Sequence, residues 1–180
     1  MKRTKVLVGG VAGLALVLGP ATAAMAEDTI VTLTVTAEDG LTITVPPTAN
    51  IGSANPGDTA TGQIGPVTVA DERAALNAAW TATVISTDFT TGGGTPAETI
   101  PDINVLYWSG GATATSGNGT FTPAQPTAAD AVIINVPRTV FTHTAGSGDN
   151  SATWNPTLLV NIPETAVAGV YTGTVTHSVL

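Results

Sequence analysis

The sequence predicts an all-β fold, a single antiparallel β-sandwich of the Ig-like kind with about nine or ten short strands. Three observations predict it. Apolar residues recur with period two along much of the chain, threonine fills many of the alternate positions, and clusters of Gly, Pro and Asn separate the runs. Threonine is β-branched, so it suits the pleated surface of a sheet and disfavours a long helix.

The first two strands are predicted on either side of a tight turn. Residues 31–36 read Val-Thr-Leu-Thr-Val-Thr, and residues 41–45 read Leu-Thr-Ile-Thr-Val. Each run places apolar side chains on one face and threonine on the other. Glu38-Asp39-Gly40 between them is expected to form a hairpin turn, because Gly40 can adopt a positive φ.

Eight further strands are predicted from the same periodicity. They are Thr59–Gln63, Val67–Val69, Ala79–Ser86, Ile103–Trp108, Ala131–Val136, Thr139–Thr144, Thr157–Ile162 and Val170–Leu180. The turn-rich segments between strands include Asn55–Asp58, Thr90–Pro96, Ser109–Gly119 and Ala145–Asn150. One short helix is expected over Asp71–Ala79. We find no internal repeat and no linker that would separate a second domain.

The first 26 residues have the three parts of a secretory signal peptide. Lys2, Arg3 and Lys5 form a basic start, residues 6–18 are uncharged and apolar, and Ala24-Met25-Ala26 places small residues at the cleavage site. The apolar part has about 13 residues, whereas a membrane-spanning helix needs about 20. We therefore expect cleavage after Ala26, no membrane span in the exported protein, and one domain over residues 27–180.

Charge and cysteine content restrict the partners and the chemistry. After Ala26 the chain has two basic residues, Arg73 and Arg138, against 13 carboxylates, a formal net charge of 2 − 13 = −11. No cluster of Lys or Arg exists to displace counterions from nucleic acid or anionic lipid, so neither is expected as a partner. The chain has no cysteine, which excludes disulfides, a thiol nucleophile and a thiolate metal site.

Four residues on two strands are expected to have structural roles. Trp80 and Ala82 share one face of their strand, and the small Ala82 leaves room for the indole to lie flat in the sandwich interior. Tyr171 and His177 share a face of the last strand, where Tyr171 resembles the tyrosine corner of Ig-like sandwiches. We expect His177 to be a core residue rather than a general base.

Two segments resemble the signature regions of WxL-type domains. They are Trp80-Thr81-Ala82-Thr83-Val84, followed by Asp88-Phe89, and the run 163–180 with its core Ala168–Thr176. That family comprises exported surface domains of Gram-positive bacteria. It is named for a Trp-x-Leu motif in the middle of the domain, and its members have a second, tryptophan-bearing strand at the C-terminal end. Here Ala82 stands in place of the leucine and His177 in place of the second tryptophan. The resemblance spans roughly Thr29–Leu180 and implies non-covalent attachment to the cell wall.

Three aromatic residues are candidates for ligand binding. Tyr107 and Trp108 are adjacent at a strand end, so one should point inward and the other outward, beside Ser109-Gly110-Gly111. An outward indole is a suitable stacking platform for a sugar ring, and capping the edge of the core is the alternative role. Trp154, which precedes Asn155-Pro156, allows the same two interpretations.

No catalytic signature is recognisable. The chain has two histidines, His143 and His177, without a nucleophile elbow or a paired-histidine metal motif. Carboxylates in turn-rich stretches could gather to bind Ca²⁺, but they match no calcium loop and are expected to be solvated turn residues. These carboxylates are Asp58, Asp88, Asp102 and Asp149. We expect no other metal or cofactor.

The sequence therefore predicts an exported, non-enzymatic cell-surface protein whose partners are cell-wall glycan or other surface proteins. No lysine follows residue 26 and no sortase signal is present, so the expected attachment is non-covalent. Two alternatives stay open. One is a structural subunit of an extracellular fibre or coat that pairs through edge strands. The other is a secreted carbohydrate-active enzyme, which would need two carboxylates roughly 5 to 10 Å apart in a cleft.

Overall fold

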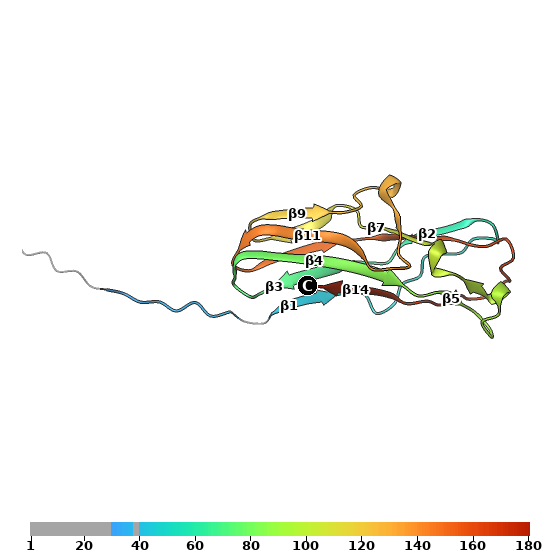
Figure 1. Ribbon diagram of the computed structural model, residues 1–180, viewed down its shortest axis with the longest axis horizontal. Coiled ribbons are helices and arrows are strands. Elements are labelled where there is room, and N and C mark those ends of the chain that lie inside the picture. The colour runs from blue at the N-terminus through green and yellow to red at the C-terminus, as the bar shows by residue number, and fades with distance from the viewer. Residues whose placement is uncertain (1–29, 38–39) are drawn as a thin grey trace, which may run out of the picture. The chain divides into compact units, whose positions relative to one another are not determined.

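The structure is a computed structural model that describes residues 30–37 and 40–180. The chain divides into two units, residues 1–34 and 35–180, and every described strand lies in the second. That unit is the predicted all-β antiparallel sandwich (Figure 1). No described helix is long and apolar enough to cross a membrane. The predicted signal peptide and the turn residues Glu38 and Asp39 lie outside the described residues.

Fourteen strands and three 3₁₀ helices are present in the described residues. The strands are β1 (Leu41–Thr44), β2 (Thr59–Gln63), β3 (Val67–Asp71), β4 (Leu76–Ser86), β5 (Phe89–Thr90), β6 (Thr99–Ile100), β7 (Val105–Trp108), β8 (Ala112–Ser116), β9 (Thr120–Pro123), β10 (Val132–Ile133), β11 (Arg138–Ser147), β12 (Asn150–Trp154), β13 (Thr157–Asn161) and β14 (Val175–Val179). The 3₁₀ helices are η1 (Pro96–Glu98), η2 (Asp102–Asn104) and η3 (Ala128–Asp130).

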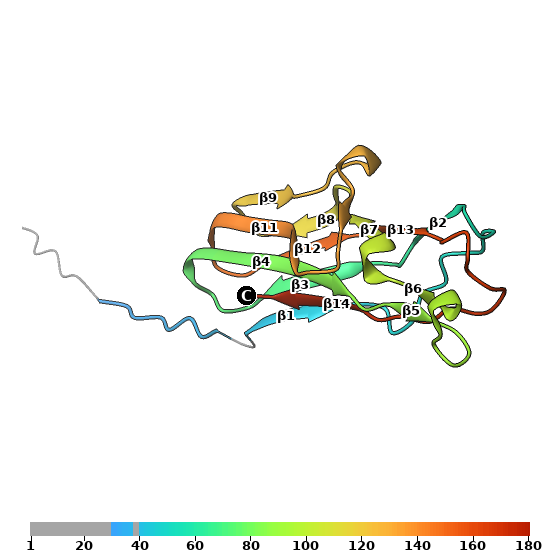
Figure 2. The same ribbon diagram turned by 45° about the vertical axis from the view of Figure 1, so that its right-hand side comes forward.

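The strands form two layers. One layer contains sheet A, in the order β1-β3-β12-β8, and sheet B, in the order β10-β7-β13-β2. The other contains sheet C, in the order β14-β4-β11-β9, and the small sheet D, β5-β6. Sheet B continues sheet A along the strand direction, because β2, β7 and β13 are separated from β3, β8 and β12 by two or three residues (Figure 2).

Glycine and proline produce these breaks between sheet A and sheet B. Pro66 and Pro156 have no backbone N–H to donate to a ladder. Gly110 between β7 and β8 has φ +69°, a conformation that few other residues adopt. The structure has more strands than the nine or ten predicted because five of them, β5, β6, β8, β9 and β12, lie in segments for which no strand is predicted.

The core lies between the two layers. Phe141 of sheet C stacks on Trp154 of sheet A with 4.8 Å between the ring centroids. Trp80 and Ala82 are buried in the same core, so the prediction that they lie on an inward face is confirmed. Val140 and Phe141 are both fully buried although they are adjacent, because the register with β4 shifts between Thr139 and Phe141.

Two predictions about local structure near the start of the sandwich are wrong. Residues 31–36 form no strand, because their alternation requires a neighbouring strand and no described strand pairs with them. Residues 71–79 form no helix. Asp71 pairs with Leu41 on one side and Asn150 on the other, and β4 already begins at Leu76, so both ends of this segment belong to sheets.

Other differences concern strands in glycine-rich or proline-rich sequence. The segment predicted as turns over residues 109–119 contains β8, and β9 and β12 are also absent from the prediction. The predicted strand 131–136 is reduced to the two residues of β10. The predicted last strand begins with an isolated bridge between Thr172 and Thr90 and becomes regular only at Val175.

Candidate functional site

The outward face of sheet B carries a strip of partly exposed apolar side chains around Trp108. Leu106 lies opposite Leu159 of β13 and Ile133 of β10, and Trp108 lies opposite Thr157. Directly paired residues of an antiparallel ladder point to the same face. We call Leu106, Trp108, Ile133 and Leu159 the Trp108 strip; each is half-buried, and none belongs to the apolar residues packed in or against the core.

Polar side chains border the Trp108 strip on its β2 side. Thr61 lies opposite Leu159 and Gln63 lies opposite Thr157, and both are exposed. Beside the indole, a Cβ placed on Gly110 would lie 3.7 Å from Cζ3 of Trp108, so the loop backbone supports the ring edge. An apolar ring on a rigid strand with hydroxyl and amide groups alongside can stack against a sugar and hydrogen-bond to it.

Tyr107 and Trp154 have no accessible face, so their prediction as ligand-binding residues is corrected. Both side chains are fully buried, at 0% exposure. The Trp154 Nε1–H donates to the Tyr107 hydroxyl over 3.0 Å, and that hydroxyl lies 3.2 Å from Nε2 of His177. The three residues form a polar chain from sheet A through sheet B to β14. Tyr107 points inward and Trp108 outward, as the alternation predicts.

The protonation of this chain follows from its burial. Desolvation lowers the pKa of His177 to about 4, and it raises the pKa of the Tyr107 hydroxyl. The neutral Tyr107 hydroxyl then donates to Nε2 of a neutral His177, which places the imidazole proton on Nδ1. That Nδ1 is buried without a hydrogen-bond partner among the described residues. His177 therefore has the properties of the predicted core histidine.

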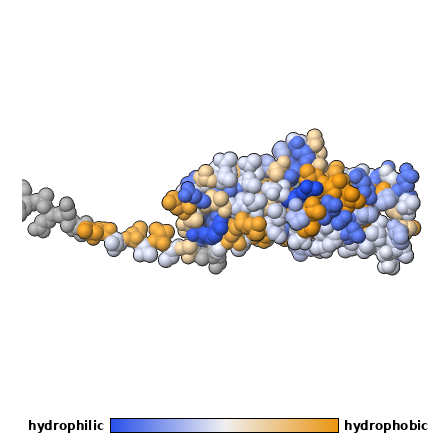
Figure 3. Space-filling view, viewed as in Figure 1, coloured by the Kyte–Doolittle hydropathy of each residue, from blue (hydrophilic) through white to orange (hydrophobic). Residues whose placement is uncertain are grey.

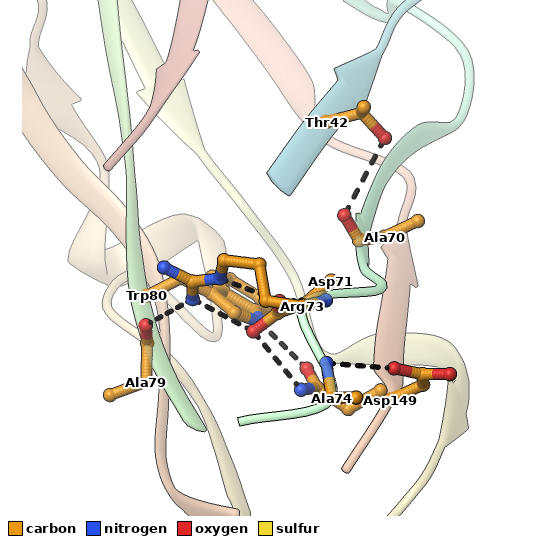
Figure 4. Close-up of polar contacts among 9 residues, drawn as sticks. Thr42, Ala70, Asp71, Arg73, Ala74, Ala79, Trp80 and Asp149 are labelled. Carbon is orange, nitrogen blue, oxygen red and sulfur yellow. Dashed lines mark hydrogen bonds and ion pairs between the residues drawn. The ribbon is translucent and has the colours of Figure 1, made fainter. Parts of the chain in front are cut away.

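Trp80 anchors a second buried polar cluster, drawn in Figure 4. Its Nε1–H donates to Oδ1 of Asn150 over 2.8 Å, and Nδ2 of Asn150 donates to Asp71 over 3.3 Å. Arg73 forms two hydrogen bonds to the fully buried Asp71 carboxylate, at 2.7 and 2.8 Å. The hydrogen bonds from Arg73 hold the pKa of Asp71 below its usual value. The cluster ties β3, β4 and β12 together.

Tyr171 holds the segment that leads into β14. Its hydroxyl lies 2.9 Å from the carbonyl oxygen of Val167, four residues upstream, and 3.1 Å from that of Ala97. This is the contact expected of a tyrosine corner.

The turn carboxylates accept local hydrogen bonds and do not converge. Asp88 accepts the backbone N–H of Asp102, Asp58 accepts from the side chain of Asn55, and Asp149 accepts the backbone N–H of Ala74. His143 is also engaged, with Nε2 2.8 Å from the carbonyl oxygen of Asn118. Within residues 30–37 and 40–180, no three His, Asp or Glu side chains are grouped to hold a metal ion.

An open groove lies between two irregular segments at the sheet B end of the sandwich. It has a volume of about 860 Å³ and is bordered by residues 45–56 on one side and residues 166–175 on the other. Ile100, Leu158 and Val160 line it, and all three belong to the core. Sequence reasoning missed this groove, since the pattern along each bordering segment does not show that the two segments lie near each other.

No family model, curated protein or solved structure gives a significant match to this chain.

Proposed function

We propose that this protein is an exported, non-enzymatic cell-surface protein, a divergent WxL-type domain that associates non-covalently with the Gram-positive cell wall through neutral sugar. The observation that carries the proposal is the outward-facing Trp108 strip. Trp108 lies on a paired strand, so its ring is positioned before binding, and little side-chain freedom is lost when a ligand binds. Thr61 and Gln63 supply the neighbouring hydrogen-bonding groups.

The surroundings of the titratable groups support a non-enzymatic role. His177 is neutral and bonded to Tyr107, and His143 is fully buried. Asp71 is paired with Arg73, and Glu98 and Asp130 each cap the start of a 3₁₀ helix. Each of these groups therefore has a structural partner or is buried, which favours a structural role for it.

Charge favours sugar stacking over ionic attachment. The exported chain has a net charge of −11, and a wall rich in phosphate and carboxylate repels such a surface. The Trp108 strip contains no charged residue, so it can approach the wall without direct charge repulsion. Divalent cations that bridge carboxylates are the competing mechanism, and chelation separates the two.

The test is retention of the purified protein on isolated cell walls. Trp108→Ala should reduce retention about tenfold or more, a loss of roughly 1.4 kcal/mol or greater, as expected for an aromatic anchor. The matched control is Leu76→Ala, which removes an apolar side chain that is 85% exposed on sheet C. Equal retention of the two variants, with unchanged melting temperatures, would refute the Trp108 assignment.

A further inference from the structure

Residues 30–37, which we call the arm, have the periodicity of a strand but no strand partner in the described part of the chain. The apolar side chains of the arm are almost fully exposed, at 83% for Val31, 88% for Leu33 and 80% for Val35. Figure 3 shows hydrophobic side chains along this segment, which is blue in Figure 1. Single exposed apolar residues are common, whereas a row of them at period two is typical of an interaction segment.

Two acidic residues lie on each side of the arm in the sequence, and the arm itself has no charged residue. Glu27-Asp28 precede it and Glu38-Asp39 follow it, while residues 29–37 contain no charged side chain. Burial of an unpaired carboxylate is costly, so the two acidic pairs limit any strand pairing to the segment between them. In a strongly acidic protein, the arm is a segment that a second copy can contact without direct charge repulsion.

The C-terminal run of residues 171–179 has an unpaired edge. Thr172 and Thr174 bond to the backbone of Thr90 and Thr87, and Leu180 exchanges two backbone hydrogen bonds with Thr81. Bonding direction alternates along an antiparallel strand, so the odd-numbered residues direct their N–H and C=O groups to the other side. No described strand hydrogen-bonds there, because β14 is the first strand of sheet C, although β1 of sheet A lies close to β14. We call this side the free edge.

The free edge borders the open groove. Tyr171, Gly173 and Val175 belong to both, and the opposite border of the groove is the segment 45–56. A strand added to the free edge would direct every second side chain toward Leu158 and Val160 in the groove. Residues 165–180 contain no Asp, Glu, Lys or Arg, so this acceptor is as neutral as the arm.

We propose that the arm of one copy adds as a β-strand to the free edge of a second copy and places Val31, Leu33 and Val35 in its groove. The lengths agree, since the arm has eight residues and spans about 26 Å when extended, and the free edge has nine. β-strand addition supplies main-chain hydrogen bonds as well as apolar burial.

This contact is head-to-tail, because each copy contributes an arm at one contact and a groove at the next. Such a heterologous contact produces open chains unless its rotation closes a ring. The proposal gives a specific form to the fibre or coat alternative, and it does not depend on wall attachment through Trp108.

The first test measures self-association of the exported chain by sedimentation over about a hundredfold range of concentration. The arm variant carries Val31→Thr, Leu33→Thr and Val35→Thr, which keep strand propensity and remove apolar surface. Its control carries Thr32→Ser, Thr34→Ser and Thr36→Ser on the opposite face of the arm. All six positions lie outside the described sandwich strands, so folding is preserved. The arm variant should associate at least about tenfold more weakly, and the control within about twofold of wild type.

The second test supplies the arm as a labelled peptide of residues 29–37. The peptide should bind the arm variant saturably, and the same peptide with Leu33→Thr should not. Val175→Pro should abolish binding, because the Val175 N–H points to the free edge and not to β4. A wild-type protein that is monomeric at every concentration tested would overturn the proposal. Equal association of the arm variant and its control would also overturn it.

Discussion

Trp80 combines apolar packing with a buried hydrogen bond, and two substitutions separate these contributions. Its ring centroid lies 6.3 Å from that of Phe141, 6.4 Å from that of Phe121 and 5.8 Å from that of His143. Its Nε1–H also donates a hydrogen bond to Oδ1 of the buried Asn150. Trp80→Ala removes the ring and the donor, whereas Trp80→Phe retains most of the ring and removes only the donor.

The two substitutions should differ in magnitude. Truncation of a buried Trp to Ala costs about 3 to 5 kcal/mol in transfer and cavity energy. Trp80→Phe leaves Oδ1 of Asn150 buried without its donor, which costs about 1 to 3 kcal/mol. Total unfolding free energies are about 5 to 15 kcal/mol, so Trp80→Ala should remove a large part of the stability. Trp80→Phe should leave a folded protein that unfolds at a lower urea concentration than wild type.

Urea denaturation, followed by far-ultraviolet circular dichroism, measures both effects. The control is Leu76→Ala at an exposed position of the same strand, which should change the unfolding free energy by no more than about 0.5 kcal/mol. The slope of unfolding free energy against urea concentration should be the same for wild type and the three variants, which would show that each exposes the same amount of surface on unfolding. A Trp80→Ala protein within about 1 kcal/mol of wild type would refute the assignment of Trp80 to the core.

Three further outcomes are expected. Because the folded-state pKa of His177, about 4, is below its ordinary value of 6.5, the unfolded state binds the proton first as pH falls, so stability decreases by up to about 3 kcal/mol between pH 6.5 and pH 4. Unfolding free energies at those two pH values test this, and a His177→Gln variant with the same pH dependence would assign the effect to other groups. Deletion of Tyr171–Leu180 should abolish cooperative folding, since it removes the neighbour of β4; a soluble truncated protein with a cooperative melt would show that β14 is peripheral. Retention on purified walls should hold steady or rise with NaCl, because screening weakens repulsion, and it should survive EDTA. Elution by NaCl would indicate a basic partner, and release by EDTA would indicate cation bridging.

The sequence pattern predicts the fold class well because alternation and turn chemistry act locally. Thr59–Gln63 and the inward Trp80 follow directly from period two. The outward position of Trp108 follows from its inward neighbour Tyr107, since adjacent strand residues face opposite ways. These predictions needed no knowledge of which strands are neighbours.

The remaining differences depend on which strands pair. The arm has an excellent strand pattern and no partner among the described strands, whereas β8, in a glycine-rich and serine-rich stretch, forms a strand because β12 lies beside it. Trp154 is buried through its contacts with Phe141 and Tyr107, and neither contact is visible in the segment Trp154-Asn155-Pro156. The groove likewise arises where segments far apart in the sequence, residues 45–56 and 166–175, lie on either side of it.

The most direct measurement of the proposed function is fractionation of the producing cells into wall, membrane and medium, with wild type and Trp108→Ala compared at equal expression. Non-covalent attachment through sugar predicts that the wild-type protein is recovered in the wall fraction and that Trp108→Ala shifts to the medium. Leu76→Ala should stay with the wall. Recovery of the wild-type protein in the membrane fraction, or in the medium at the same level as Trp108→Ala, would contradict wall attachment.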